Sequence, residues 1–177
     1  MPRASDQDRI IVYVDGACTG NPGSGGYAAL VLDGPCQQRI TGGYRLTTNN
    51  RMELMAVIAG LSTLGARSAT TVRCDSLYVV KAMTKGWARR WKANGWRLTR
   101  NTRALNSDLW ERLLELDDRH DLRFEWVPGH ADDERNNLCD GWAQAAAGGV
   151  DLPADVAYEA ELARVPSDLR RFANRTG

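Results

Sequence analysis

Short apolar runs rich in β-branched residues recur along the chain and predict strands. Strands are predicted over residues 10–14, 27–32, 39–45, 70–74 and 122–127. The first run (IIVYV) has the pattern of a strand that is buried on both faces, and it ends at Asp15. A loop with five glycines is predicted over residues 16–26, and Gly34-Pro35 marks a turn. The first three strands would therefore form an antiparallel meander.

A helix is predicted after the third strand, because apolar residues recur there at helical spacing. The residues expected to face the core are Leu54, Val57, Ile58, Leu61 and Leu64. Asn50 with Glu53 resembles a capping box, so the helix should begin near Asn50 and have Gly65 as its C-cap. A strand-helix-strand unit demands parallel strands and a right-handed crossover. If the two strands are neighbours, their ends place Asp15 and Asp75 side by side.

The second half of the chain predicts further helices. Ser76 is placed to cap a short helix over residues 76–83, and residues 86–103 predict a helix followed by a loop. Either Ser107 or Asp108 would cap a helix that runs to about residue 116. The last predicted helix, residues 133–147, has Asn136 and Asp140 on one face. Its Leu138 and Trp142 share another face, which we expect to contact the core.

Composition indicates an ordinary globular protein, with 43% hydrophobic and 25% charged residues among 177. We expect one folded domain over residues 1–149 and a tail over residues 150–177. The tail could form a helix around residues 154–163 or remain loose; the sequence leaves both open. No apolar run is long enough to span a bilayer, and the first ten residues lack a signal-peptide pattern. The expectation is a monomeric cytoplasmic protein without a membrane partner.

Charge is distributed unevenly, although the net charge is only +1. Residues 76–107 contain no Asp or Glu and eight cations, whereas residues 108–140 contain eleven acids and four Arg. Such asymmetry indicates a polyanionic partner at one face. Three tryptophans alternate with these cations, Trp87, Trp91 and Trp96, and most of them are expected to pack on one another or on Trp110 as a small core.

Cysteine and glycine patterns exclude several kinds of site. The four cysteines are widely spaced, no CxxC pair occurs, and there are only two histidines, which argues against zinc and favours reduced thiols. Residues 20–25 have the glycine spacing of a phosphate-binding loop, but Gly26 replaces the required lysine. A dinucleotide-binding turn needs a helix after the glycines, and here a strand follows. His120 has no chemical context, and we assign it no role.

Several acids are candidates for chemistry. Asp15 and Asp75 each follow an apolar strand, and two acids on adjoining strands repel each other unless a cation lies between them. Glu53 is balanced between the capping box and a functional role. Asp140, taken alone, is more typical of a solvated surface acid. His130 lies in the loop WVPGHA and could titrate near neutral pH, although an exposed loop histidine is the simpler interpretation in isolation.

Taken together, the motifs resemble the type 1 ribonuclease H family. The matching stretches are YVDGACTGNPGSGGYA, TTNNRMELMA, RCDSLYVV, WARRWKANGW and WVPGHADDERNNLCD, in the order of that family and over roughly residues 10–147. The resemblance implies an α/β fold with a five-stranded mixed sheet, an antiparallel meander plus parallel strands, flanked by helices. It also implies cleavage of the RNA strand of an RNA·DNA hybrid, which leaves 3′-hydroxyl and 5′-phosphate ends.

Individual roles also come from this resemblance. Two Mg²⁺ ions, with Mn²⁺ as a substitute, would be bound by the acids Asp15, Glu53, Asp75 and Asp140. His130 corresponds to a histidine that aids proton movement or product release. Contacts to RNA 2′-hydroxyls are implied for Cys18, Asn21 and Asn49, and a pocket for a phosphate of the DNA strand for Thr48 and Asn136. The basic handle, about residues 81–103, would contact nucleic acid through Lys85, Arg89, Arg90 and Lys92.

Two positions depart from the family pattern. Leu77 stands where relatives often have Gln touching the hybrid, and Leu46 stands where an Arg often binds DNA phosphate. Two other functions remain open, a recombinase- or transposase-type DNA nuclease of the same fold and a hybrid-binding module without catalysis. The first usually requires additional DNA-binding domains, and the second would require a missing acid.

Overall fold

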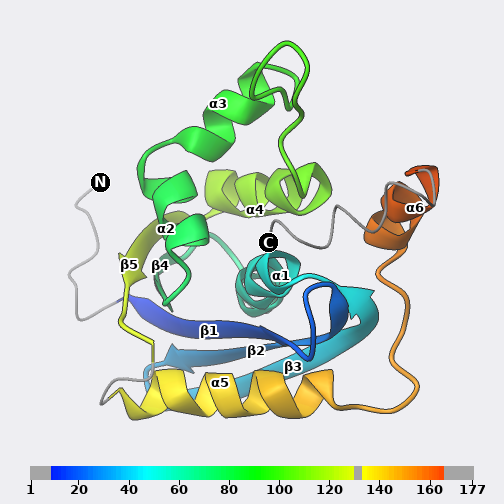
Figure 1. Cartoon of the computed structure of the whole chain (residues 1–177). Coiled ribbons are helices and arrows are strands. Elements are labelled where there is room, and N and C mark those ends of the chain that lie inside the picture. Colours follow the sequence, from blue (N-terminus) through cyan, green and yellow to red (C-terminus); the bar gives the residue numbers. More distant parts are fainter. Residues whose placement is uncertain (1–8, 130–132, 166–177) are drawn as a thin grey trace.

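The computed structural model describes residues 9–129 and 133–165, and it contains a five-stranded mixed sheet with the strand order β3-β2-β1-β4-β5 (Figure 1). The strands are β1 (Ile10–Cys18), β2 (Gly23–Asp33), β3 (Cys36–Thr47), β4 (Ala69–Cys74) and β5 (Asp121–Trp126). β1, β2 and β3 form an antiparallel meander, while β4 pairs in parallel with both β1 and β5. The predicted α/β fold class is therefore confirmed.

Helices cover both faces of this sheet. They are α1 (Asn49–Ser62), α2 (Leu77–Thr84), α3 (Trp87–Ala93), α4 (Ser107–Arg119), α5 (Glu134–Ala147) and α6 (Val156–Arg164). α5 packs on β1, β2 and β3 from one side, and α1 packs on β1 and β2 from the other (Figure 1). α4 packs on α1 on the side away from the sheet. Within the described part of the chain, no helix combines the length and apolar character needed to cross a membrane.

The main core forms between the sheet, α1 and α4. All four predicted core residues of α1 before Leu64 are buried, namely Leu54, Val57, Ile58 and Leu61, and Leu64 packs at the margin of the core. Trp110 of α4 is fully buried and meets Trp91 edge to face, with ring centroids 5.7 Å apart. Trp91 and Trp96 both pack against the main core, whereas Trp87 is exposed.

The predicted glycine-rich loop over residues 16–26 is wrong for most of its length. β1 continues past Asp15 to Cys18, and β2 begins at Gly23, so only residues 19–22 connect the two strands. A side chain at Gly16 would collide with the backbone of Met52 and Glu53 on α1. The glycine is needed because β1 and α1 approach each other closely there. A glycine in the sequence does not by itself distinguish such a close approach from a loop.

Helix ends also differ from the expectation. Thr48, not Asn50, caps α1 by accepting a hydrogen bond from the Arg51 N–H at 3.4 Å, and Thr63 rather than Gly65 is the C-cap. α4 follows Asn106, which has a positive φ of 59° and caps without a side-chain bond. α2 does follow its predicted cap Ser76.

The core-facing side of α5 is also different from the predicted one. Leu138 is 47% exposed, whereas small residues at helical spacing, Cys139, Ala143 and Ala147, are buried against the sheet. Trp142 is partly buried beside them, with Arg39 above its ring at 4.5 Å. Small side chains let the helix approach the sheet closely, which turns the larger Leu138 toward solvent.

Candidate active site

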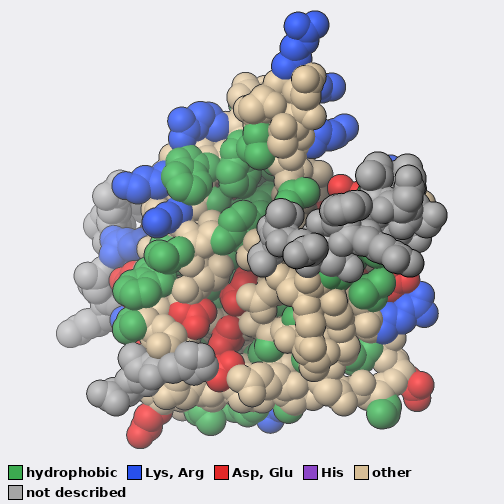
Figure 2. Space-filling view, in the orientation of Figure 1, with side chains coloured by type: hydrophobic (Ala, Val, Ile, Leu, Met, Phe, Trp, Pro, Cys, Tyr) green, Lys and Arg blue, Asp and Glu red, His purple; other side chains and the backbone are tan. Residues whose placement is uncertain are grey.

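Sheet topology and two helices bring the four predicted acids to one region. The parallel pairing of β1 with β4 ends at Val14 and Cys74, so Asp15 and Asp75 follow at neighbouring strand positions. Glu53 projects from the second turn of α1 and Asp140 from the second turn of α5, on opposite faces of the sheet. Figure 2 shows acidic side chains gathered at the centre of one face of the molecule.

Glu53 is buried and has one carboxylate oxygen without a partner. The residue is 5% exposed, and its Oε2 has no hydrogen-bond partner among the described residues. Burial, together with the charges of Asp15, Asp75 and Asp140, raises the pKa of Glu53 well above its usual value. Because Thr48 caps α1, the capping-box interpretation of Glu53 is wrong. A buried carboxylate that stabilises no helix end requires a compensating charge.

Asp15 lies in the same electrostatic environment. It is 5% exposed, and its Oδ1 accepts a hydrogen bond from the Gly16 N–H at 2.7 Å. Burial raises the pKa of Asp15 to about 7, and the charges of Asp75 and Asp140 add to this effect despite the Gly16 bond. The acids therefore lie close enough to repel one another, which favours a cation between them.

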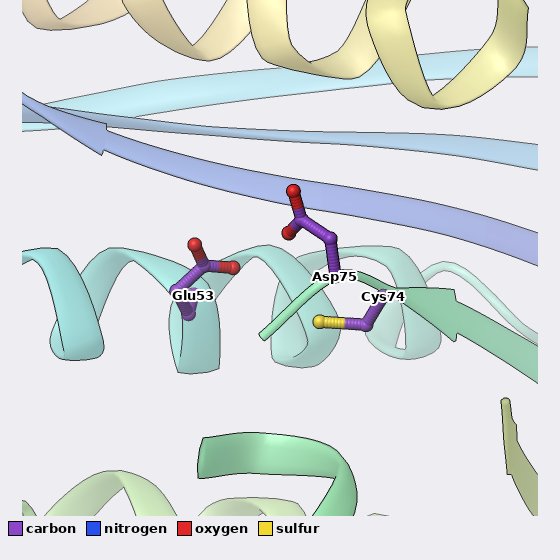
Figure 3. A group of neighbouring side chains, drawn as sticks. All are labelled: Glu53, Cys74 and Asp75. Atoms are coloured by element: carbon purple, nitrogen blue, oxygen red, sulfur yellow. The ribbon is translucent and has the colours of Figure 1, made fainter. Parts of the chain in front are cut away.

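A close-up shows how Glu53 and Asp75 face each other (Figure 3). Glu53, Asp75 and Cys74 each offer a ligand atom, and these atoms all lie within 4.8 Å of one another. The Cys74 thiol is fully buried, and burial raises its pKa well above the usual value, so it remains protonated. A protonated thiol is a poor ligand for a hard cation, so the carboxylate oxygens are the effective donors.

Asp140 is half-buried on α5, and Gln144 donates a hydrogen bond to its Oδ1 at 2.7 Å. Its charge raises the pKa of both Asp15 and Glu53, so it does not behave as an isolated surface acid. Gathered carboxylates and a buried Glu53 oxygen without a hydrogen-bond partner among the described residues together fit a divalent ion. Mg²⁺ and Mn²⁺ both prefer oxygen ligands of this kind.

The structure brings together part of the predicted nucleic-acid contacts. Asn21 accepts a hydrogen bond from the Asn49 N–H at 3.2 Å, so the loop after β1 meets the first residues of α1. Thr48 is the adjoining cap, and Cys18 ends β1 a few residues before Asn21. Asn136 instead lies in the first turn of α5 and is 1% exposed, with its Oδ1 unpartnered among the described residues. His130 lies outside the described residues.

The basic handle has acidic neighbours in space, although its own segment contains no Asp or Glu. Arg89 pairs with Asp117 and Asp118 of α4, and Lys92 pairs with Glu111 at 2.6 Å. The acids come from the segment that follows the basic run, and α4 places them beside α3. Figure 2 nevertheless shows Lys and Arg side chains projecting around α3.

Lys85 and Arg90 are the predicted handle contacts that make no ion pair among the described residues. Both are exposed. These two cations are therefore freer to meet phosphate than Arg89 and Lys92.

Sequence reasoning missed two buried polar groups. Arg51, 2% exposed, donates to carboxylates of Asp108 and Asp155, which lie far away in the sequence. An Arg within an apolar helix was the available signal. His120 is 3% exposed and accepts a hydrogen bond from the Ser68 N–H at Nδ1, 3.3 Å away, which indicates a structural role.

Fold and site together define an α/β protein with a carboxylate cluster suited to a divalent cation, next to the end of the paired strands β1 and β4. The family model for RNase H matches residues 7–148. The chain belongs to the RNase H family, which confirms the resemblance seen in the sequence. Members of this family use divalent metals, in agreement with the cluster of acidic side chains described above.

Known relatives extend over most of the chain. Ribonuclease H of Syntrophus aciditrophicus (strain SB) is 54% identical over 152 residues, 86% of this chain and 88% of the relative. Ribonuclease H of Rippkaea orientalis (strain PCC 8801 / RF-1) is 50% identical over 151 residues, 85% of this chain and 93% of the relative. The crystal structure of LC9-RNase H1, a type 1 RNase H with the type 2 active-site motif, has a TM-score of 0.71 and 30% identity. That match covers 93% of this chain and 85% of the other. Family and fold support ribonuclease H activity, a nuclease hydrolase function.

Proposed function

We propose that this protein is an endoribonuclease that hydrolyses the RNA strand of RNA·DNA hybrids and leaves 3′-hydroxyl and 5′-phosphate ends. Two Mg²⁺ ions would be held by Asp15, Glu53, Asp75 and Asp140, with Mn²⁺ able to replace them. The observation that carries this proposal is the convergence of these acids, with a buried Glu53 oxygen that lacks a partner among the described residues.

The residues of the chain divide the chemical tasks. Asp15 follows the last residue of the central strand β1 that pairs with β4, and from that position it would help to hold the ions. When bound, the metal ions lower the pKa of the attacking water and stabilise the leaving 3′-oxygen. Without cations the clustered carboxylates would repel the scissile phosphate, so cleavage should require a divalent metal. His130 would move a proton or assist product release.

Substrate selection would use both sides of the site. The corner formed by Asn21 and Asn49, with Cys18 nearby, is proposed to read RNA 2′-hydroxyls, which DNA lacks. Thr48 and Asn136 would bind a phosphate of the DNA strand. LC11-RNase H1, whose fold this chain shares with a TM-score of 0.58 at 21% identity over 78% of this chain and 96% of that one, was solved in complex with an RNA/DNA hybrid. The monomeric state and cytoplasmic location remain predictions.

Cleavage assays test the proposal directly. Labelled RNA·DNA hybrid, duplex DNA and duplex RNA are incubated with Mg²⁺ or with EDTA. We expect cleavage of the RNA strand of the hybrid alone, and only with metal. Asp15→Asn should abolish cleavage while hybrid binding survives, and Asp33→Asn, an exposed acid at the opposite end of the sheet, should leave cleavage intact.

The other outcomes are equally informative. Full activity of pure Asp15→Asn protein would refute its role as a metal ligand. Cleavage of duplex DNA would favour a recombinase- or transposase-type nuclease, and hybrid binding without cleavage would indicate a binding module.

A further inference from the structure

The segment after α5 is attached to the folded domain at the end of β3. The Arg45 N–H donates to the Pro153 carbonyl at 2.9 Å, and the Arg45 side chain pairs with Glu159 at 2.7 Å. α6 therefore lies beside the junction where β3 ends and α1 begins (Figure 1). This junction, residues 47–51, is called the β3–α1 corner below. The family match ends at residue 148, before this attachment.

Asp155 is the buried anchor of the attachment. It is 5% exposed, and its carboxylate accepts hydrogen bonds from the Thr47 hydroxyl and the Arg51 Nε, both at 2.7 Å. A second bond comes from Arg51 Nη2 at 2.8 Å, and Asp155 also caps α6 through the Tyr158 N–H. One carboxylate thus binds the first and the last residue of the β3–α1 corner.

The opposite side of the Arg51 guanidinium is held as well. Asp108 of α4 accepts from Nη1 at 2.8 Å and from Nη2 at 2.7 Å. Bidentate bonds between a planar guanidinium and a carboxylate fix orientation as well as distance. Arg51 is therefore locked between the C-terminal segment and α4, and the backbone of the corner is locked with it.

The residues between these anchors are the ones proposed to meet the substrate. Thr48 and Asn49 lie between Thr47 and Arg51, and both are partly exposed. Glu53 is held differently, because its neighbours Met52 and Leu54 are completely buried in the core. A loosened β3–α1 corner should therefore disturb the substrate contacts of Thr48 and Asn49 more than it disturbs the positions of the clustered acids.

We propose that Asp155 is a positioning residue that holds Thr48 and Asn49 in the geometry required to bind the hybrid, acting through Thr47 and Arg51. This inference rests on the proposed hybrid-cleaving function. It assigns the C-terminal segment a part in substrate binding, and it predicts that weakening this anchor changes KM rather than kcat.

Steady-state cleavage of the hybrid, measured over a range of hybrid concentrations, tests the inference. Asp155→Asn removes the charge but keeps the size, and it should raise KM about tenfold with kcat within about twofold of the wild type. Asp155→Glu, which retains the carboxylate, should recover part of the lost affinity. Glu159→Gln, on the same segment but only partly buried and ion-paired with Arg45 among the described residues, is the matched control and should leave both constants unchanged.

A second variant with a smaller effect on stability tests the same role if Asp155→Asn does not fold. Thr47→Val removes only the hydroxyl bond to Asp155 from a fully buried site and leaves the ion pair in place. It should raise KM about threefold, in line with the loss of one hydrogen bond. Thermal melts define a temperature at which all the variants assayed are folded.

The outcomes distinguish a failure of the Asp155 positioning role from a failure of the proposed function. A fall in kcat with an unchanged KM would mean that Asp155→Asn only lowers the folded fraction, and it would overturn the positioning role. Unchanged constants in both Asp155→Asn and Thr47→Val would overturn it too, while the proposed function stands on wild-type cleavage. If the wild type itself neither binds nor cleaves the hybrid, the proposed function is the part that fails.

Discussion

Asp15→Asn should stabilise the metal-free protein at the same time as it removes activity. The Asp15 carboxylate is buried among other acids, and its pKa is raised from the ordinary value of 3.8 to about 7. Asn has nearly the same shape, and its side-chain oxygen can still accept the Gly16 N–H. The substitution therefore removes an unfavourable charge with little change in packing.

The magnitude follows from the pKa. Each pH unit between the two pKa values is worth about 1.4 kcal/mol, so ionising Asp15 in the folded state costs up to about 4 kcal/mol. Below about pH 4 the group is protonated in both the folded and the unfolded state, and the cost is absent. Between about pH 4 and pH 7 only the folded state keeps the proton, so wild-type stability falls as pH rises. Above about pH 7 the full cost is present.

Urea unfolding in EDTA measures this difference. At about pH 8 the free energy of unfolding of Asp15→Asn should exceed that of the wild type by about 2–4 kcal/mol, and at about pH 4 the two should nearly agree. Added Mg²⁺ should stabilise the wild type more than the variant and narrow the gap. Asp33→Asn, which changes an exposed acid, serves as the charge control.

A variant that is equally or less stable than the wild type at both pH values would refute this reasoning. It would mean that the Asp15 charge is already compensated in the folded protein without metal.

Three further variants test other parts of the structure. His130→Ala should lower kcat for hybrid cleavage in steady-state kinetics without abolishing cleavage. A complete loss of cleavage would make the histidine a required base. Arg90→Ala should raise KM and flatten its salt dependence more than Arg89→Ala, because Arg89 is already paired with acids of α4; equal effects would contradict this. Asp155→Ala leaves buried Arg51 with one acid and should lower the free energy of unfolding in urea by about 3–5 kcal/mol, whereas a loss below about 1 kcal/mol would mean that the ion pair stabilises little.

Local patterns in the sequence were sufficient for the order and type of the main elements. The alternation of apolar strands with a helix such as α1 predicts the parallel pairing of β1 with β4, since short connections and handedness leave few alternatives. Asp15 and Asp75 were expected side by side for the same reason, and the strand register places them there. Periodicity carries this information because it reflects which side of each element is removed from water.

Other features depend on residues that are distant in the chain. Gly16 was interpreted as part of a loop, although it is the point where β1 passes the backbone of α1. Leu138 was expected in the core, yet the small residues beside it bring α5 closer to the sheet and leave Leu138 exposed. Arg89 lies in a segment without acids, yet α4 packs beside α3 and supplies Asp117 as its partner.

The sequence by itself thus determined the family and the fold class, because these follow from local pattern and residue type. It indicated the full set of acids that are proposed to bind metal only through the resemblance to that family. Only the tertiary structure decided that Glu53 is buried, with its Oε2 unpartnered among the described residues, and that Arg51 is held between Asp108 and Asp155. The physical reason is that burial and charge pairing depend on which distant segments pack together, and a one-dimensional pattern does not specify those contacts.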